Sequence, residues 1–353
     1  MNLSRHLLDE AAAAGVLSAT QPDALWQFLS ERDAAHETPS FKPAHILHYL
    51  GGLIAIGAMT LFMTLGWERF GAGGLLAISI GYALLAFALA EILIVRPRLT
   101  LAAGITAALG VVMTPLAIYA LQHLLGLWPD DASVQRAYRA YHSVIDWRWL
   151  LMELATLAVG AISLWRYRLP FLVLPVAVTL WYLSMDLAPF LAGGEPQSMF
   201  TPFGMRVSLG SGLVMLLGAV GVDFRSRSAR DFAFWLYIFG TLAFWGGLSS
   251  LESTSELARL GYAVINLVMI MIGAALSRRV LAVFGGLGVA VYLGHLSHTV
   301  FKDSMLFPVA LTAIGLALVG VGIFWQRHER TIGKRLRSVF PAALQQMVDR
   351  RAV

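Results

Sequence analysis

The chain alternates between long apolar stretches and short polar ones. About ten stretches, each roughly twenty residues long, carry few or no Asp, Glu, Lys or Arg residues, and short charged clusters separate them. A helix of about twenty apolar residues crosses the hydrocarbon core of a bilayer. The pattern therefore predicts an all-α polytopic membrane protein, with spans at 46–67, 71–95, 99–125, 150–165, 169–187, 205–222, 232–251, 257–277, 280–301 and 304–326.

Two of these spans are less regular than the others. The span at 150–165 contains Glu153, and the span at 205–222 is short and begins beside Arg206. A long arginine side chain can extend to the headgroups, so neither residue excludes a span. We therefore predict three parts: a cytoplasmic helical pair and linker at 1–44, a transmembrane bundle at 45–326, and a basic amphipathic tail at 327–353.

The placement of basic residues predicts the orientation of the bundle. Of the 26 Lys and Arg residues, nineteen fall on one side of the predicted spans and seven on the other. Loops rich in Lys and Arg stay in the cytoplasm. Both termini are therefore predicted to be cytoplasmic.

The amino-acid composition argues against several classes of function. Hydrophobic residues make up 58% of the chain, and there are no cysteines, which excludes disulfides and thiolate chemistry. The formal charge of +5 lies at the predicted membrane borders rather than in one basic patch with aromatics, so we predict no nucleic-acid partner. We find no catalytic or nucleotide-binding motif, and we predict neither an enzyme nor a cofactor.

The segments outside the spans suggest partners. Residues 1–40 predict two short helices, with Gly15 as a left-handed cap of the first and Thr20 and Asp23 as a capping box for the second. So small a pair needs a surface to pack on, either the cytoplasmic loops or a protein partner. The basic amphipathic tail is predicted to lie along anionic lipids of the inner leaflet.

The loop at 129–146 has apolar residues at helical spacing. This pattern predicts an amphipathic helix at the membrane interface, which would act as a lid over two spans or as a substrate gate.

Acidic residues inside the apolar spans are the first functional candidates, because a charge in hydrocarbon costs about 2.5–3.5 kcal/mol. Glu91 would pair with Arg96 or Arg98 at the inner border, or would couple protons. Glu153 and Asp186 lie near the outer ends of neighbouring spans. They would face one another across a vestibule or act as ordinary interfacial acids.

Asn266 and two prolines are further candidates for a substrate or proton pathway. Asn266 would hydrogen-bond between helices or contact a substrate. Pro115 and Pro175 would interrupt two spans, and transporters often bind their substrates at broken helices. His295 and His298 are spaced like metal ligands, but they have no third ligand at suitable spacing, so we predict no metal site.

Two glycine stripes predict where helices approach closely. One consists of Gly286, Ala290 and Gly294, and the other of Gly210, Val214 and Gly218. Small residues spaced four apart let two membrane helices come into contact.

The first 125 residues resemble a known family. The helical stretch 7–29 is followed by the glycine-rich run His48-Tyr49-Leu50-Gly51-Gly52-Leu53-Ile54-Ala55-Ile56-Gly57-Ala58, and then by Gly66-Trp67-Glu68. This order resembles a bacterial family of polytopic inner-membrane proteins known as a domain of unknown function. The resemblance implies location in the bacterial inner (plasma) membrane and many spans, and it implies no catalytic residues.

Two functions remain open on this evidence. The predicted spans, prolines and buried acids favour a small-solute transporter. The cytoplasmic helices, the basic tail and the scarcity of polar residues at mid-membrane favour a scaffold or sensor acting through its N-terminal helices.

Overall fold

The structure is a computed structural model, and every regular segment that it describes is helical. It describes residue 8 and residues 11–18, 21–26, 43–96, 99–128, 147–192, 201–226, 230–251 and 255–301, with single positions at 309, 312, 315, 316 and 320. The helices are α3 (Pro43–Ile94), α4 (Thr100–Leu124), α6 (Trp147–Tyr167), the 3-10 turn η2 (Pro170–Leu172), α7 (Val173–Leu191), α8 (Pro202–Arg225), α9 (Phe234–Ser250), α10 (Glu256–Ala275) and α11 (Arg279–Phe301).

Within these described residues, seven helices are long and apolar enough to cross a membrane. The protein is therefore a multi-pass, all-α integral membrane protein. The two irregular spans are both confirmed as helices, as α6 and α8. Helix α9 has 17 residues and corresponds to the predicted span at 232–251. The last predicted span, 304–326, lies almost entirely outside the described residues, so the count of about ten stays a prediction.

Helix α3 contains two of the predicted spans, separated at one glycine. Gly71 has φ 62° and ψ −171°, which no other residue of α3 approaches. This backbone conformation is almost exclusive to glycine, because a Cβ would clash with the neighbouring peptide. The chain therefore reverses at Gly71, between the predicted spans 46–67 and 71–95.

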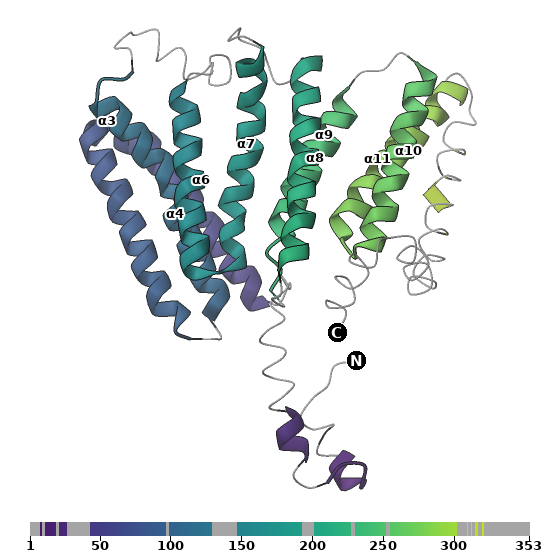
Figure 1. Cartoon of the computed structure of the whole chain (residues 1–353), viewed down its shortest axis with the longest axis horizontal. Helices are drawn as coiled ribbons and strands as arrows, with labels where there is room; N and C mark the ends of the chain where they lie inside the picture. The colour runs from purple at the N-terminus through teal and green to yellow at the C-terminus, as the bar shows by residue number, and fades with distance from the viewer. Residues whose placement is uncertain are drawn as a thin grey trace.

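Successive helices run in alternating directions across the bundle (Figure 1). The alternation brings Arg96, Arg166, Arg168, Arg225, Arg278 and Arg279 to one end, which we call the arginine-rich rim. Arg148, Arg206 and Arg259 belong to the opposite rim. This separation is the one that the sequence predicts. The orientation of the two rims relative to the cytoplasm stays a prediction.

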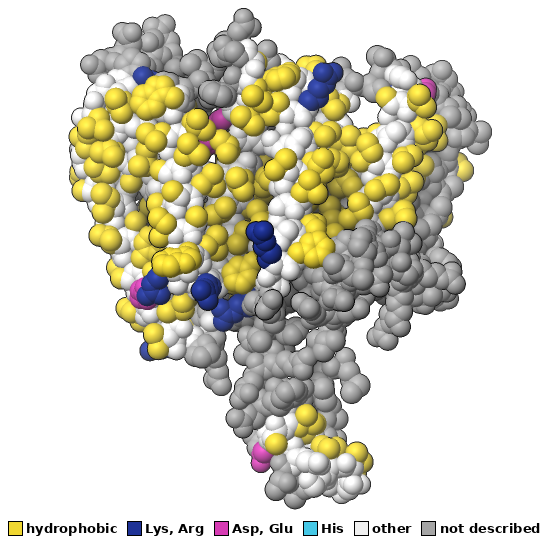
Figure 2. Space-filling model, in the orientation of Figure 1, with side chains coloured by type: hydrophobic (Ala, Val, Ile, Leu, Met, Phe, Trp, Pro, Cys, Tyr) yellow, Lys and Arg dark blue, Asp and Glu magenta, His cyan; other side chains and the backbone are white. Residues whose placement is uncertain are grey.

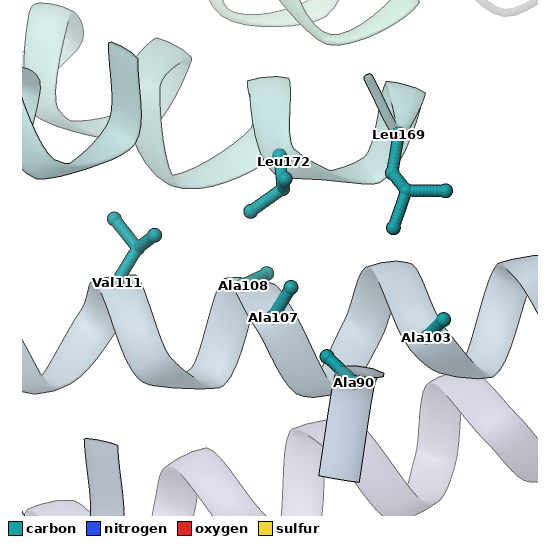
Figure 3. Close-up of a cluster of buried hydrophobic side chains, with 7 residues drawn as sticks. All are labelled: Ala90, Ala103, Ala107, Ala108, Val111, Leu169 and Leu172. Carbon is teal, nitrogen blue, oxygen red and sulfur yellow. The ribbon is translucent and has the colours of Figure 1, made fainter. Parts of the chain in front are cut away.

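The first half of the bundle packs through small residues. Ala90 of α3 meets Ala103, Ala107 and Val111 of α4, and Leu172 of η2 closes the cluster from the other side (Figure 3). Ala103, Ala107 and Val111 have no exposed surface. Alanines let helix backbones approach closely, so van der Waals contact replaces the hydrophobic effect that lipid cannot supply.

The second half packs around an aromatic residue. Tyr237 of α9 is 1% exposed and lies among Ala219 of α8, Met269 of α10 and Leu281 of α11. The two halves meet along α7, which packs against both α8 and α9.

Both predicted glycine stripes are wrong. A methyl group added at Gly210, Gly218, Gly286 or Gly294 would meet none of the residues that the structure describes. Among the glycines of α8 and α11 in close contact are Gly285, one residue from a predicted stripe, and Gly212 and Gly288, each two residues away. Successive residues of a helix are about 100° apart, so a shift of two residues moves the stripe to the opposite face.

Gly212 and Gly288 allow close contacts in the second half. A Cβ at Gly212 of α8 would lie 2.2 Å from the backbone nitrogen of Phe244 in α9. A Cβ at Gly288 of α11 would lie 1.9 Å from Oδ1 of Asn266 in α10. Neither helix pair could pack as it does with a larger residue at these positions.

Part of the N-terminal helical pair is described. Residues 11–13 and 21–26 are helical, and Gly15 has φ 71°, which confirms the predicted left-handed cap. The backbone N–H of Val16 donates to the carbonyl of Ala11, as in a Schellman cap. Thr20 lies outside the described residues, so the capping box stays a prediction. The loop at 129–146 and the tail at 327–353 lie outside them as well.

Candidate functional site

Glu153 and Asp186 face one another between two neighbouring helices. Glu153 is in the second turn of α6, and Asp186 is near the end of the antiparallel helix α7. Their carboxyl groups lie close enough to interact by a hydrogen bond, and both residues are partly buried. Oε2 of Glu153 is shielded from solvent. Figure 2 shows a small acidic area within the largely apolar surface over these helices.

The contact has a chemical consequence. An ionised carboxylate only accepts hydrogen bonds, so a bond between two carboxyl groups requires a proton on one of them. Two negative charges at this distance would also repel strongly in a medium of low polarity. The Glu153–Asp186 pair is therefore a place where a membrane protein can hold one exchangeable proton.

Glu91 forms an ion pair with Arg166, which is not one of the two predicted partners. Nη2 of Arg166 donates to Oε1 of Glu91 at 3.0 Å, and both side chains are about half exposed. Arg96 is five residues after Glu91. Side chains three or four residues apart are neighbours on a helix, whereas those five apart lie on different faces. Arg98 lies outside the described residues.

Ring packing explains why Arg166 reaches Glu91. Phe87, one turn before Glu91, stacks on Tyr167 with ring centroids 6.1 Å apart. This contact brings the end of α6 beside the end of α3. Since exposed ion pairs of this kind contribute at most about 1 kcal/mol, the pair is an interfacial contact rather than a buried functional charge.

Asn266 links two helices and has no exposed surface. Its Oδ1 accepts a hydrogen bond from Nε1 of Trp245 at 3.1 Å, and its Nδ2 donates to the carbonyl of Tyr262 at 2.9 Å. The amide fits into the space above Gly288 of α11. The predicted interhelical hydrogen bond is therefore confirmed. The pathway role of Asn266 stays a prediction.

The two prolines differ in their positions. Pro115 lies inside α4, which continues as one helix from Thr100 to Leu124. Pro175 lies in the first turn of α7, directly after η2. A proline in a first turn removes no helical hydrogen bond, because the first amide groups have no partner inside the helix. Pro175 therefore does not interrupt its span, and the predicted interruption at this position is wrong.

The sequence reading missed a buried cluster at the arginine-rich rim. Arg278, in the turn between α10 and α11, is 7% exposed, and Asp223 of α8 is 2% exposed. Nη2 of Arg278 donates to both carboxylate oxygens of Asp223, at 3.0 and 2.8 Å. It also donates to Oδ1 of Asp231 at 3.0 Å, and Nη1 donates to Asp231 Oδ2. The guanidinium lies 4.5 Å from the ring centroid of Tyr237.

This cluster joins the rim ends of α8, α9, α10 and α11. Burial alone would lower the pKa of Arg278, but the carboxylates of Asp231 and Asp223 outweigh burial and raise it. Arg278 therefore stays charged. The sequence shows these residues only as ordinary loop charges, since 55 residues separate Asp223 from Arg278.

A second cluster closes the opposite rim. Buried Gln122 of α4 donates to the carbonyl of Arg148 in α6 at 3.0 Å and accepts from Nε1 of Trp128 at 3.2 Å. The imidazole of His123 stacks on Trp128, with centroids 5.0 Å apart. The guanidinium of Arg148 lies 5.2 Å from the centroid of the same indole. These contacts tie α4 to α6, and we assign them a structural role.

Metal ligands are not grouped in the part of the chain that the structure describes. No set of three or more His, Asp or Glu side chains lies close enough there to bind an ion. The side chain of His298 is outside the described set.

Comparison with protein-family models, with curated proteins and with solved structures finds no significant match. The predicted family resemblance therefore stays a prediction. Function has to be inferred from the residues of this chain.

Proposed function

We propose that the protein is a small-solute carrier whose Glu153–Asp186 pair takes up and releases a proton during transport. The close approach of these two carboxyl groups, contributed by neighbouring membrane helices, is the observation that supports this function. Ionisable residues inside membrane spans are costly, and in pumps and transporters they often form proton relays.

The pair supplies a mechanism for coupling. When α6 and α7 lie together, repulsion between two carboxylates favours one bound proton. When a rearrangement separates the helices, each carboxyl regains solvent and the proton is released. The free-energy difference between the two states is then that between a carboxyl pair that shares one proton and a pair of separate, hydrated carboxylates.

Proton binding is tested first, because it needs no knowledge of the solute. Purified protein in nanodiscs is titrated with acid and base, and the infrared band of protonated carboxyl groups is followed. We expect a band in the wild type that disappears in Glu153→Gln and in Asp186→Asn. Glu91→Gln is the matched control, because Glu91 is paired with Arg166 at the exposed rim, and it should keep the band.

Transport is tested next in proteoliposomes with an imposed pH gradient and a set of radiolabelled sugars, amino acids and organic acids. We expect gradient-driven uptake of at least one class, lost in Glu153→Gln and retained in Glu91→Gln. A carboxyl band that survives both Glu153→Gln and Asp186→Asn would refute the proton site. Uptake that is independent of the gradient would refute coupling.

The scaffold or sensor role stays an alternative prediction. It requires a protein partner for the N-terminal helices. Deletion of residues 1–40 should then remove a partner from cross-linked membranes while the spans still insert.

A further inference from the structure

Acidic residues at the arginine-rich rim are already paired with arginines. Among the described residues there, Glu91 is bound by Arg166, and both Asp223 and Asp231 are bound by Arg278. The remaining arginines of the rim therefore have a positive charge that these carboxylates do not neutralise.

Two of these arginines belong to successive turns of the arginine-rich rim. Arg168 precedes η2, and Arg225 ends α8. Both are exposed, and neither forms an ion pair with a described residue. Phe171 of η2 packs on Trp235 at the start of α9, with ring centroids 5.5 Å apart, which joins the turn after Arg168 to the helix that follows α8.

The backbone at Arg168 is unusual as well. Arg168 has φ 51°, in the left-handed region that residues other than glycine rarely adopt. The backbone N–H of Arg168 donates to the carbonyl of Leu164 at 3.0 Å, so Arg168 forms the left-handed C-terminal cap of α6. This cap ends α6 at the rim.

Exposed apolar side chains lie beside these arginines. Trp165, one turn before Arg168, is 76% exposed, and Ile162 is 64% exposed. On α8, Leu217 is 63% exposed and Phe224 is 41% exposed. Figure 2 shows basic side chains gathered below an apolar surface over the lower ends of α6, α7 and α8. A charged group beside exposed hydrocarbon matches the two parts of a phospholipid.

We propose that Arg168 and Arg225 bind the phosphate of an anionic phospholipid, whose acyl chains lie along Trp165 and the exposed side of α8. Basic pockets between membrane helices bind anionic headgroups in this way. The surface next to the arginines is apolar, which favours a lipid over a soluble phosphate ion. This site differs from the predicted lipid contact of the tail at 327–353, and it does not depend on the transport function.

The test is a lipid titration monitored by native mass spectrometry. Full-length protein in detergent is titrated with phosphatidylglycerol and, separately, with phosphatidylcholine. Variants are Arg168→Gln, Arg225→Gln and the pair together. Arg206→Gln is the matched control, because Arg206 is also exposed, forms no ion pair with a described residue and lies on the opposite rim of α8.

We expect the wild type to prefer phosphatidylglycerol, and each rim variant to bind it about fivefold more weakly, from about 1 kcal/mol per arginine near an anionic surface. The double variant should lose the preference, and Arg206→Gln should keep it. Equal losses in Arg206→Gln and Arg168→Gln would overturn the proposal. Displacement of the lipid by millimolar inorganic phosphate would also overturn it, because the site would then recognise a free anion.

Fold is checked separately. Each variant must retain the helical circular dichroism and the elution volume of the wild type. Should the double variant fail this check, the single variants decide the outcome, since an unchanged lipid preference in both Arg168→Gln and Arg225→Gln overturns the proposal.

Discussion

Arg278→Gln is the substitution that best tests how the second half of the bundle is held together. Arg278 neutralises two carboxylates at a site that is largely closed to solvent. Counting side-chain atoms alone, Arg278 is 8% exposed, Asp223 is 1% exposed and Asp231 is 12% exposed. Glutamine keeps much of the volume and some hydrogen bonding, but it removes the charge. The buried carboxylate of Asp223 and the partly buried one of Asp231 would then lose the compensating charge of Arg278.

The expected cost follows from this burial. Removing one partner of a buried ion pair costs about 3–5 kcal/mol, because the remaining charge loses its compensation. Contact with the ring of Tyr237 adds to the loss, since a cation over an aromatic face contributes about 1–2 kcal/mol. We therefore expect Arg278→Gln to lower the free energy of unfolding by at least about 3 kcal/mol.

Asp223→Asn should be milder. It leaves Arg278 paired with Asp231 and lowers the net negative charge of the cluster. The loss is that of charged hydrogen bonds, about 1.5–3 kcal/mol. Arg279→Gln is the control, because Arg279 is exposed and forms no ion pair with a described residue, and it should change stability by about 0.5 kcal/mol or less.

The assay is reversible unfolding in mixed micelles by titration with sodium dodecyl sulfate, followed by tryptophan fluorescence and by helical circular dichroism. Both signals should report one transition, with the same slope in each variant. An Arg278→Gln protein within 1 kcal/mol of the wild type would refute the role of the cluster. A loss of the same size in Arg279→Gln would show that rim charge in general, rather than this buried contact, is responsible.

Three further predictions concern glycines and the buried amide. Gly71→Ala should cost about 1–3 kcal/mol, measured in the same unfolding assay, because alanine is strained at φ 62° and ψ −171°. Gly288→Ala should cost about 1–3 kcal/mol, because the added methyl group displaces the amide of Asn266. Gly286→Ala is the control and should be close to neutral, because its methyl group meets open space. Equal effects of the two substitutions would contradict the packing. Trp245→Phe removes the hydrogen-bond donor to Asn266 and should cost about 0.6 kcal/mol beyond any packing loss. A double-mutant cycle with Asn266→Ala isolates this coupling energy. A coupling energy of zero would contradict the hydrogen bond.

Several features could be predicted from the sequence because they depend on local chemistry. The membrane class, the helix ends of α4, α6, α7, α8, α9, α10 and α11 to within about four residues, and the grouping of arginines at one rim all agree with the structure. The left-handed cap at Gly15 agrees as well. Backbone polar groups inside lipid must be satisfied within each helix, so a long apolar stretch has few alternatives.

Part of the candidate site could also be predicted. Glu153 and Asp186 are conspicuous because acids are rare in apolar spans, and helices joined by a short turn are antiparallel neighbours. Two residues near the same rim of such a pair therefore come together. Their close approach depends on the rotation of α6 and α7, which the sequence does not specify.

The sequence by itself thus determined which segments cross the membrane and where their charges lie along the membrane normal. Only the tertiary structure decided which face of each helix packs, and which charges meet. Gly212 rather than Gly210 contacts α9, and Arg278 rather than Arg279 enters the buried cluster. The physical reason is that apolar burial in lipid sets the length and position of a helix but leaves its rotation free. Contacts with partners tens of residues away then fix that rotation.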